Sequence, residues 1–388
     1  MLTNKDIFCI STQDWNGLWT RKHRFMLKLS KQGNRVFYIE SQASLISINI
    51  IKNDWKRIFR WLKGPRKISE NLWVATLPLV LPCFQMYSIV NLINNWFLKI
   101  LFKFWLKKLN FKDLIFWTYT PFSYTFVGNL GDNFAIYECV DEFSDSKGLV
   151  NPKVIKLLEK KLLEKVDLVI VTHNNLLESK KLINNNIHLI PNGAEVEHFR
   201  KTFLKETLIS PEMLKMPKPI IGFLGAVQYW IDFDLIKFLA LKRPEWSLVL
   251  LGPVGRLAKI EKIINIPNVY LLGGKNYYSL PSYVKAWDVC INPYIINKTS
   301  DNCSPLKLYE YMASGKPIVS VDMPEARKFS NVIAIGTSYE DFFNKVELIV
   351  KGLPESRDRI ESRIKIAEKH SWDCRFQELE RVLGLYIA

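Results

Sequence analysis

Residues 304–319, SPLKLYEYMASGKPIV, decide the fold of this chain, with Asp301-Asn302-Cys303 directly before them. The stretch is typical of a loop, a short helix, a tight turn and a buried strand. Ser304 is a favourable N-cap, and Pro305 suits the first helical position because it has no N–H to satisfy. Gly315 suits the left-handed residue that ends a helix, and a strand follows. We therefore expect a helix that starts at residue 305 and opens toward a loop.

A helix start of this kind is a candidate phosphate site. Its free N–H groups, here those of Leu306 and Lys307, point outward and carry partial positive charge. Lys307 and Glu310 are three residues apart and share one helix face. Lys307 can bind a phosphate while Glu310 accepts hydrogen bonds from sugar hydroxyls. This combination suits a nucleotide-sugar. The alternative is an ordinary capped helix with a solvated Lys/Glu pair.

Length and composition indicate a folded protein of two domains. The chain has 388 residues, of which 48% are hydrophobic and 24% charged. Its six cysteines are scattered and include no C-x-x-C pair, which favours reduced thiols over disulfides or zinc. The first ten residues do not resemble a signal peptide. We therefore expect a cytoplasmic protein.

The positive charge is concentrated in the N-terminal region. Residues 1–112 contain 19 Lys/Arg and 5 Asp/Glu, a net of +14 out of the total of +16. Residues 51–67 interleave seven basic residues with Trp55, Phe59 and Trp61, and residues 86–108 carry a polar stripe on an otherwise apolar helix. The stripe consists of Asn91, Asn95, Lys99, Lys103 and Lys107. We expect both segments to contact an anionic membrane surface without spanning it; the alternative for the second is a core helix whose lysines reach solvent.

Strands and helices alternate along the whole chain. A β-α-β unit opens it, with a loop at residues 14–17 after the first strand. A polar, Pro-containing linker is expected after Asn192-Gly193, and a second α/β series begins at residue 220. This pattern predicts an α/β protein with two doubly wound parallel sheets, whose ligands bind beyond the carboxyl ends of the strands. We expect the domains to be 1–203, joined by the C-terminal helix 371–388, and 204–370.

The chain resembles glycosyltransferases of the GT-B fold, close to the large group called family four and to bacterial enzymes that build teichuronic acids and capsules. The resemblance is carried by ordered landmarks through most of the chain: HLIPNGAEVEHF (188–199), IIGFLG (220–225), LVLLGPVG (248–255), SLPSYVKAWDVCINPY (279–294), the 304–319 stretch, and HSWDCRF (370–376). It implies a nucleotide-sugar donor in the second domain and an acceptor in the first.

The resemblance carries over only part of the family's donor site. Glu310, in EYMA, matches the glutamate that holds the ribose hydroxyls of the nucleotide. Eight positions earlier the family has a second glutamate for the transferred sugar, but this chain has Asn302. The loop 225–234 also lacks the usual Arg and Lys for the diphosphate, so we infer that Lys307 and the helix start carry more of that task. The donor-binding prediction comprises Asn302, Ser304, Leu306, Lys307, Glu310, Gly225 and Tyr229.

The first domain is expected to supply the acceptor site and the base. Asp141 is the first candidate for the general base and Glu142 the second, because both follow a strand at its carboxyl end; the alternative for Asp141 is a helix N-cap. The other candidates for the acceptor side are Gly17, Arg21, His23, Arg24 and His173. The resemblance implies no metal and no other cofactor, because GT-B relatives neutralise the departing diphosphate with a helix dipole and cations.

The function that these observations favour is transfer of a sugar, most simply from a UDP-sugar, to a lipid-linked or polysaccharide acceptor in bacterial cell-surface polysaccharide synthesis. The enzyme would lie on the inner face of the cell membrane. Two alternatives remain open: a sugar-nucleotide epimerase of the same fold, and a basic, non-enzymatic nucleic-acid binder. The second is disfavoured because the basic clusters alternate with apolar helix faces and no nucleic-acid motif is present.

Overall fold

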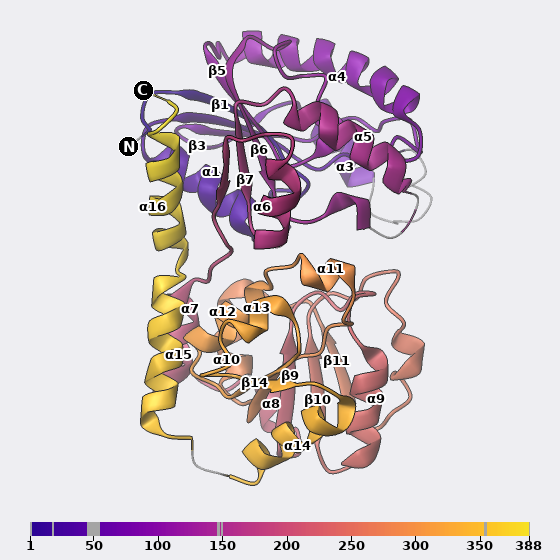
Figure 1. The fold of residues 1–388 in the computed structure, drawn as a ribbon, viewed down its shortest axis with the longest axis vertical. Helices are drawn as coiled ribbons and strands as arrows, with labels where there is room; N and C mark the ends of the chain where they lie inside the picture. Colours follow the sequence, from indigo (N-terminus) through magenta and orange to yellow (C-terminus); the bar gives the residue numbers. More distant parts are fainter. Residues whose placement is uncertain are drawn as a thin grey trace. The chain divides into compact units, whose positions relative to one another are not determined.

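The computed structural model describes residues 2–17, 19–44, 55–145, 148, 150–352 and 355–387. Its contacts divide the chain into two compact units, residues 1–191 with 376–388 and residues 192–375 (Figure 1). The boundaries expected from the sequence lie at 203/204 and 370/371. The linker expected after Asn192 is wrong: the segment forms α7 (Val196–Arg200), η3 (Lys201–Phe203) and α8 (Pro211–Leu214), because Val196, Phe199 and Met213 are buried in the core of the second unit.

The first unit is built on a sheet of eight strands among the described residues, in the order β3-β4-β2-β1-β5-β6-β7-β8. Of the pairs between these described strands, only β3–β4 is antiparallel. The strands are β1 (Asp6–Ile10), β2 (Arg35–Ile39), β3 (Arg66–Ser69), β4 (Leu72–Ala75), β5 (Leu114–Thr118), β6 (Asp132–Cys139), β7 (Leu168–Val171) and β8 (Ile187–Leu189). β1 pairs with both β2 and β5, so the chain changes direction across the sheet beside β1.

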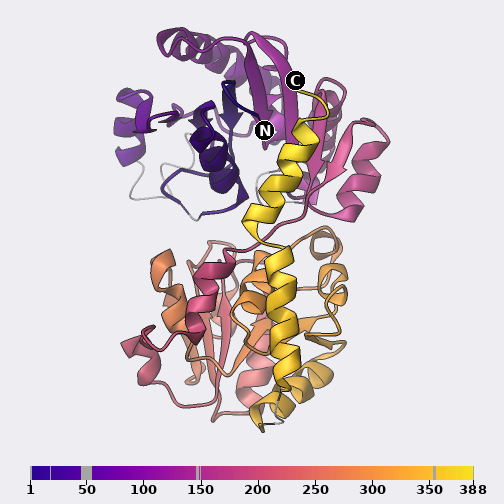
Figure 2. The ribbon, with the colours of Figure 1, turned by 90° about the vertical axis from the view of Figure 1, so that its left-hand side faces the viewer.

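Helices cover both faces of this sheet (Figures 1 and 2). They are α1 (Arg21–Lys31), α3 (Trp55–Leu62), α4 (Ser88–Lys108), α5 (Pro152–Leu163) and α6 (Asn174–Lys181), with the 3-10 turns η1 (Pro121–Ser123) and η2 (Phe143–Asp145). Phe102 of α4 packs on Phe8 of β1 with ring centroids 5.1 Å apart. On α1, Phe25 contacts Phe376 of α16 (Trp372–Leu383) at 6.0 Å, so the end of the chain adds to the first unit.

The second unit has a parallel sheet in the order β11-β10-β9-β12-β13-β14. Its strands are β9 (Ile220–Leu224), β10 (Ser247–Leu251), β11 (Val269–Gly273), β12 (Val289–Asn292), β13 (Ile318–Val321) and β14 (Ala334–Gly336). The remaining helices are α9 (Phe233–Lys242), α10 (Leu280–Val284), α11 (Lys298–Asp301), α12 (Leu306–Ala313), α13 (Pro324–Arg327), α14 (Tyr339–Val350) and α15 (Arg357–Lys369), with η4 (Ile260–Lys262) and η5 (Tyr277–Ser279). The order reverses between β9 and β12, and ligands of doubly wound sheets bind at such a switch point.

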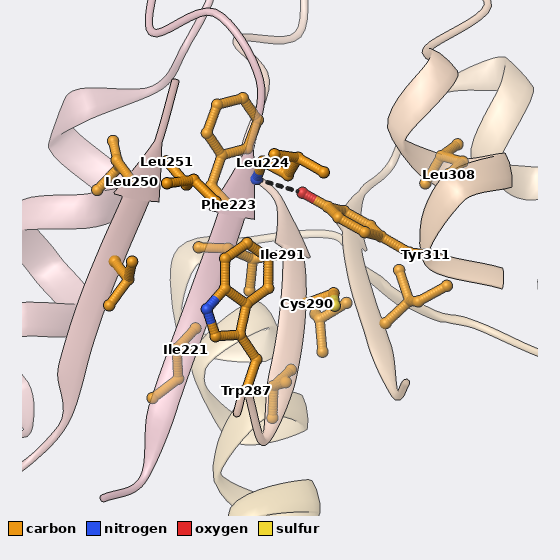
Figure 3. Packing of buried hydrophobic residues seen from close by; sticks show 14 of the residues in the cluster. Ile221, Phe223, Leu224, Leu250, Leu251, Trp287, Cys290, Ile291, Leu308 and Tyr311 are labelled. Atoms are coloured by element: carbon orange, nitrogen blue, oxygen red, sulfur yellow. Dashed lines mark hydrogen bonds between the residues drawn. The ribbon is translucent and has the colours of Figure 1, made fainter. Parts of the chain in front are cut away.

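Close packing fixes α12 against the switch point of the second unit. A Cβ atom on Gly222 would lie 2.0 Å from Trp287, so only glycine lets the indole lie directly on β9 (Figure 3). Beside it, the backbone N–H of Leu224 donates to the hydroxyl of the buried Tyr311 at 2.7 Å. This bond ties the middle of α12 to the last residue of β9, which is the strand end where the candidate donor site begins.

Candidate functional site

The start of α12 is not capped by Ser304. The helix begins at Leu306, its N-cap is Pro305, and no side chain caps it, so the expected cap at Ser304 is wrong. The buried Ser304 hydroxyl instead lies 3.4 Å from both the Tyr309 hydroxyl and the Glu325 carboxylate. Burial, followed by the charge of Glu325, raises the pKa of Tyr309. Because no side chain caps the start of α12, more of its first-turn N–H groups remain available to an anion.

Lys307 brings a cation to the same place. A Cβ atom on Gly225, at the carboxyl end of β9, would lie 2.1 Å from Cε and 3.0 Å from Nζ of Lys307. Gly225 has φ +145°, a conformation open to glycine, and the neighbouring Gly252 has φ +158°. The lysine therefore lies over bare backbone, and in the described part of the chain its ammonium forms no ion pair. An uncapped helix start, a cation and an accessible backbone are what a diphosphate needs.

The other predicted donor residues lie around this point. Glu310 is half-buried one turn further along α12 and raises the pKa of Tyr311, although burial is the larger cause. Asn302 is the C-cap of α11, and its amide donates to the Lys298 carbonyl at 3.0 Å. Tyr229 stands edge-on to Trp230 at 5.0 Å in the loop after β9. The structure thus brings Leu306, Lys307 and Gly225 together.

The basic residues at the start of α1 take different roles. Arg21 is 2% exposed and ion-paired with Glu138, and it donates to the carbonyls of Ile190 and Pro191 at 2.7 and 2.9 Å. Trp117 completes the set by donating to Glu138 at 2.9 Å. Arg21 was expected to face a ligand, but its guanidinium instead links α1 to β6 and the end of the first unit's sheet.

His23 is also part of the fold rather than an exposed base. Its Nδ1 accepts from the Thr20 N–H at 3.3 Å, which leaves Nε2 to donate to the Asp14 carbonyl at 3.1 Å. Burial lowers its pKa to about 4, so the ring is neutral at pH 7. The same carbonyl accepts from Gly17 at 2.9 Å, which closes the 14–17 loop. Arg24 is buried, with 9% of its surface exposed.

The two acidic candidates differ sharply in their surroundings. Glu142 accepts from Lys180 at 2.8 Å, and Lys180 also donates to the buried Glu159 at 2.7 Å. Burial raises the pKa of Glu142, but Lys180 and Ser144 together outweigh it and leave the pKa below its usual value. Asp141 is exposed at the end of β6. Asp141 is therefore better placed to meet a hydroxyl than Glu142, which is committed to an ion pair.

His173 caps the helix that follows the next strand. Its Nδ1 accepts from the Asn175 N–H at 3.2 Å, and its side chain is 2% exposed. It therefore lies at the carboxyl end of β7, as expected, but holds α6 in place.

Lys22 is a candidate that the sequence analysis missed. Its side chain is 6% exposed, its ammonium donates to the Thr12 hydroxyl, and it lies over the Tyr119 ring at 5.4 Å. Burial lowers its pKa, and Asp141 is the strongest opposing influence. Lys22 thus brings a cation to the carboxyl ends of β1 and β6, next to Asp141. Its position within RKHR gave no signal, because only the fold decides which of four successive basic residues faces the strand ends.

A cavity of about 250 Å³ opens beside Thr12 in the first unit. It lies at the carboxyl ends of β1, β2 and β5 and beneath the inner face of α4. Its walls include Ser11 and Thr12 after β1, Glu40 and Ser41 after β2, and Thr120 after β5. This is the switch point of the first sheet, where a ligand is expected.

The helix α4 buries its asparagines together with part of its apolar residues and leaves a row of large apolar side chains exposed. Asn95 donates to the Phe122 carbonyl at 2.6 Å and to Thr125 at 2.8 Å, and Asn91 donates to the same carbonyl at 3.1 Å. The outward side chains are between 41% and 61% exposed; they are Ile89, Leu92, Ile93, Trp96, Phe97, Ile100 and Phe104. We call these seven residues the outer face of α4. The predicted polar stripe is therefore split, with its asparagines buried and Lys103 and Lys107 in solvent.

The basic segment 51–67 is described only in part, because residues 51–54 lie outside the described residues. In α3, Arg57 and Arg60 bind Asp14 at 2.9 and 3.3 Å, whereas Phe59 is 63% exposed. Arg57 and Arg60 therefore form ion pairs with the 14–17 loop, and the Phe59 side chain is exposed on the surface.

Within the described ranges, no group of His, Cys, Asp and Glu is arranged to hold a metal ion. A D-x-D pattern is present at residues 232–234, but Asp232 caps α9 and Asp234 binds Lys262 at 2.6 Å. The absence of a metal requirement stays a prediction.

Comparison with known proteins defines the class. Residues 218–351 match the family model for glycosyl transferases group 1. The provisionally assigned teichuronic acid biosynthesis glycosyltransferase TuaH of Bacillus subtilis (strain 168) is 26% identical over 268 residues, which cover 64% of this chain and 66% of that protein, just under two thirds of its length.

Solved structures agree over nearly the full length. Sucrose-phosphate synthase from Thermosynechococcus elongatus has a TM-score of 0.72 at 15% identity and covers 98% of both chains. The Anabaena protein HepE, in complex with UDP and glucose, has a TM-score of 0.64 at 12% identity and covers 97% of this chain and 99% of its own.

The structural matches show that the chain has the GT-B fold of these glycosyltransferases. More particularly, its second unit carries a glycosyl transferases group 1 domain. The α/β architecture and the class expected from the sequence are thereby confirmed.

Proposed function

We propose that the protein transfers a hexose from a UDP-sugar to a lipid-linked saccharide during bacterial surface-polysaccharide synthesis, at the inner face of the cell membrane. The observation that carries the proposal is the meeting of the uncapped start of α12, the Lys307 ammonium and the bare backbone of Gly225 at one strand end. The similarity to TuaH supports the polysaccharide context, and HepE, solved with UDP and glucose, supports the donor.

The second unit would bind the donor. The N–H groups of Leu306 and Lys307 and the Lys307 ammonium would hold the diphosphate and stabilise its charge as the sugar leaves. Glu310, one turn further on, would accept hydrogen bonds from the ribose hydroxyls. Asn302 stands where relatives have a glutamate for the transferred sugar, so it would help to set which sugar is accepted.

The first unit would bind the acceptor and supply the proton acceptor. If the reaction inverts the anomeric carbon, Asp141 would take the proton of the attacking hydroxyl. If it retains, the leaving phosphate would do so and Asp141 would position the acceptor. Burial raises the pKa of Asp141, which suits a proton acceptor, and in both cases the Lys22 ammonium would oppose that rise by its opposite charge.

The membrane contact would be made by the outer face of α4. Seven large apolar side chains on one helix face exceed what a soluble surface usually leaves open together. Lys103 and Lys107 beside them, and the net charge of +14 in residues 1–112, suit anionic lipid headgroups. Of the helices that the structure describes, none is long and apolar enough to cross a bilayer, so the proposal is a helix lying in the interface.

The proposed binding of a nucleotide-sugar donor is tested by thermal unfolding with UDP, GDP, ADP and their common sugars. Wild type should be stabilised by the uridine compounds, since a ligand that binds only the folded state raises its stability. Lys307→Met and Glu310→Ala should lose most of that shift.

Lys237→Met, an exposed lysine on α9, is the matched control and should keep the shift. A shift that survives in both site variants would place the nucleotide elsewhere. Conversion of the UDP-sugar to an epimer without transfer would favour the epimerase alternative.

The proposed membrane contact is tested by sedimentation with vesicles of phosphatidylglycerol or of phosphatidylcholine. Wild type should bind the anionic vesicles more tightly, and the triple variant W96Q/F97Q/I100Q should lose at least ten-fold in binding. Leu241→Gln, which alters a 60% exposed leucine of the second unit, is the control and should bind as wild type does. Unchanged binding by the triple variant would remove α4 from the contact.

A further inference from the structure

The cavity in the first unit has two chemically different walls. Its apolar wall consists of five phenylalanines, Phe84, Phe102, Phe122, Phe126 and Phe143, together with aliphatic side chains. Its polar lining includes the hydroxyl-bearing residues Ser11, Thr12, Ser41 and Thr120, which follow the strand ends. A ligand that fits both walls must itself have an apolar part and a polar end.

The apolar wall is preformed. Phe84 meets Phe122 edge-on with ring centroids 5.3 Å apart, and Phe102 meets Phe126 in the same way at 5.2 Å. These rings are 8% exposed or less and hold one another in place. The pocket therefore does not need to be built by the ligand, which lowers the cost of binding.

Arginines surround the polar end of the cavity from outside its lining. Among the described residues that line the cavity, Glu40 is the one charged residue; it is fully buried and accepts from Arg66 at 2.7 Å, with Arg60 at 3.7 Å. Arg60 also approaches Asp14, which binds Arg57 at 2.9 Å. Three guanidinium groups thus face two carboxylates around this end. That balance favours an anion, and a phosphate matches guanidinium donors well.

One helix separates the cavity from the surface proposed for the membrane. Leu98 and Phe102, on the inner face of α4, line the cavity, whereas Trp96, Phe97 and Ile100 on its outer face are 54–60% exposed. Figures 1 and 2 show α4 at the rim of the first unit. A lipid held at the outer face therefore lies within one helix diameter of the cavity.

We propose that this cavity binds the phosphate-proximal segment of the acceptor's apolar chain, with the chain on the phenylalanine wall and the phosphate toward the arginine-rich end. The inference rests on the proposed function for the source of the ligand. The chemical class of the ligand, a phosphorylated apolar chain, is inferred from the residues that line and surround the cavity. It makes the lipid a part of acceptor recognition and not only an anchor.

The test uses farnesyl phosphate as the probe and isothermal titration calorimetry on the full chain. Leu98→Trp fills the cavity from the inner face of α4, and Ile100→Gln, two residues on, alters the outer face only. Leu98→Trp should weaken farnesyl phosphate binding at least ten-fold, while Ile100→Gln should leave it unchanged. Inorganic phosphate should not bind measurably, and farnesol should bind more weakly than its phosphate.

Vesicle sedimentation gives the reciprocal readout. Ile100→Gln should weaken vesicle binding, and Leu98→Trp should not. Leu77→Trp fills the cavity from beyond β4 and repeats the test if Leu98→Trp fails to fold, as judged by circular dichroism. Equal loss of farnesyl phosphate binding in inner-face and outer-face variants, or no loss in either filled variant, would overturn the proposal.

Failure of the proposed function is a separate result. If no uridine nucleotide stabilises the protein but Leu98→Trp still loses farnesyl phosphate, the lipid site stands without the transferase assignment. If UDP stabilises the protein and the filled variants bind farnesyl phosphate normally, the donor site stands and the cavity assignment falls.

Discussion

At the scale of single residues, burial decides what a charge can do. Arg21, Lys22 and His23 follow one another on α1, yet the first is locked to Glu138, the second reaches Thr12 beside Asp141, and the third is neutral. Lys307 shows the opposite case, because Gly225 leaves its ammonium over open backbone. A cation becomes a candidate for chemistry only where the fold leaves it without a structural task.

The neutral His23 predicts a pH dependence of stability. Burial lowers its pKa to about 4, whereas an unfolded histidine titrates near 6.5. Between these values the unfolded state binds one more proton, so the free energy of unfolding falls as pH falls, by roughly 2 kcal/mol between pH 6.5 and 4.5. His23→Gln removes this titration and keeps a residue that suits the third position of a capping box.

Urea unfolding at pH 7 and pH 4.5 measures the difference. Wild type should lose roughly 2 kcal/mol more than His23→Gln over this interval. Parallel losses in the two proteins would show that His23 is charged in the folded state. Lys31→Gln, on the same helix and exposed, serves as the control and should follow wild type.

The candidate site could be predicted from the sequence only where its residues are neighbours in the chain. Leu306, Lys307 and Glu310 lie within one helix turn or so, and a capped-helix pattern with Gly315 locates them. Ser304 was assigned a cap because its true partners, Tyr309 and Glu325, are reached through the fold. Lys22 was passed over for the same reason, since strand ends far apart in the chain define its surroundings.

At the scale of elements, α4 is the informative case. Its pattern predicted a helix with a polar stripe, and the structure has that helix as Ser88–Lys108. The sequence could not show that the asparagine half of the stripe points inward, because that depends on the free carbonyl of Phe122. β3 and β4 were missed because β3 is exposed and rich in polar residues, without the alternation that marks a half-buried strand.

The buried asparagines and exposed apolar residues of α4 predict an unusual stability pattern. Asn95→Ala removes one buried and one partly buried hydrogen bond and leaves the Phe122 carbonyl with fewer donors, so it should cost about 1–3 kcal/mol. Ile100→Gln, at a position 54% exposed, should change the free energy of unfolding by less than about 0.5 kcal/mol. Urea unfolding of the two variants checks this, and a larger loss in Ile100→Gln would mean that the outer face of α4 is covered in solution.

At the scale of the whole molecule, charge and chemistry are divided between the two units. The first holds most of the net charge, the apolar outer face of α4, the cavity and Asp141. The second holds the glycosyl transferases group 1 domain and the Lys307 site. Each has its own hydrophobic core. A substitution in one unit should therefore impair one half of the reaction and spare the other.

Asp141→Asn and Lys307→Met test that division of labour together. Asp141→Asn removes the proposed base or positioning group while the second unit is untouched, so UDP should still raise the unfolding temperature but sugar transfer should fall at least 100-fold. Lys307→Met should lose the UDP shift and the transfer. Transfer is measured as radiolabel passing from the stabilising UDP-sugar into the lipid fraction of bacterial membranes.

Glu164→Gln, a 51% exposed carboxylate that follows α5, is the matched control for the first unit and should transfer normally. If Asp141→Asn also abolishes the UDP shift, the first unit takes part in donor binding and the division fails. If it transfers at the wild-type rate, Asp141 is neither base nor positioning group. Because Glu142 is committed to Lys180, the proton would in that case have to pass to the leaving phosphate, as in a retaining transferase.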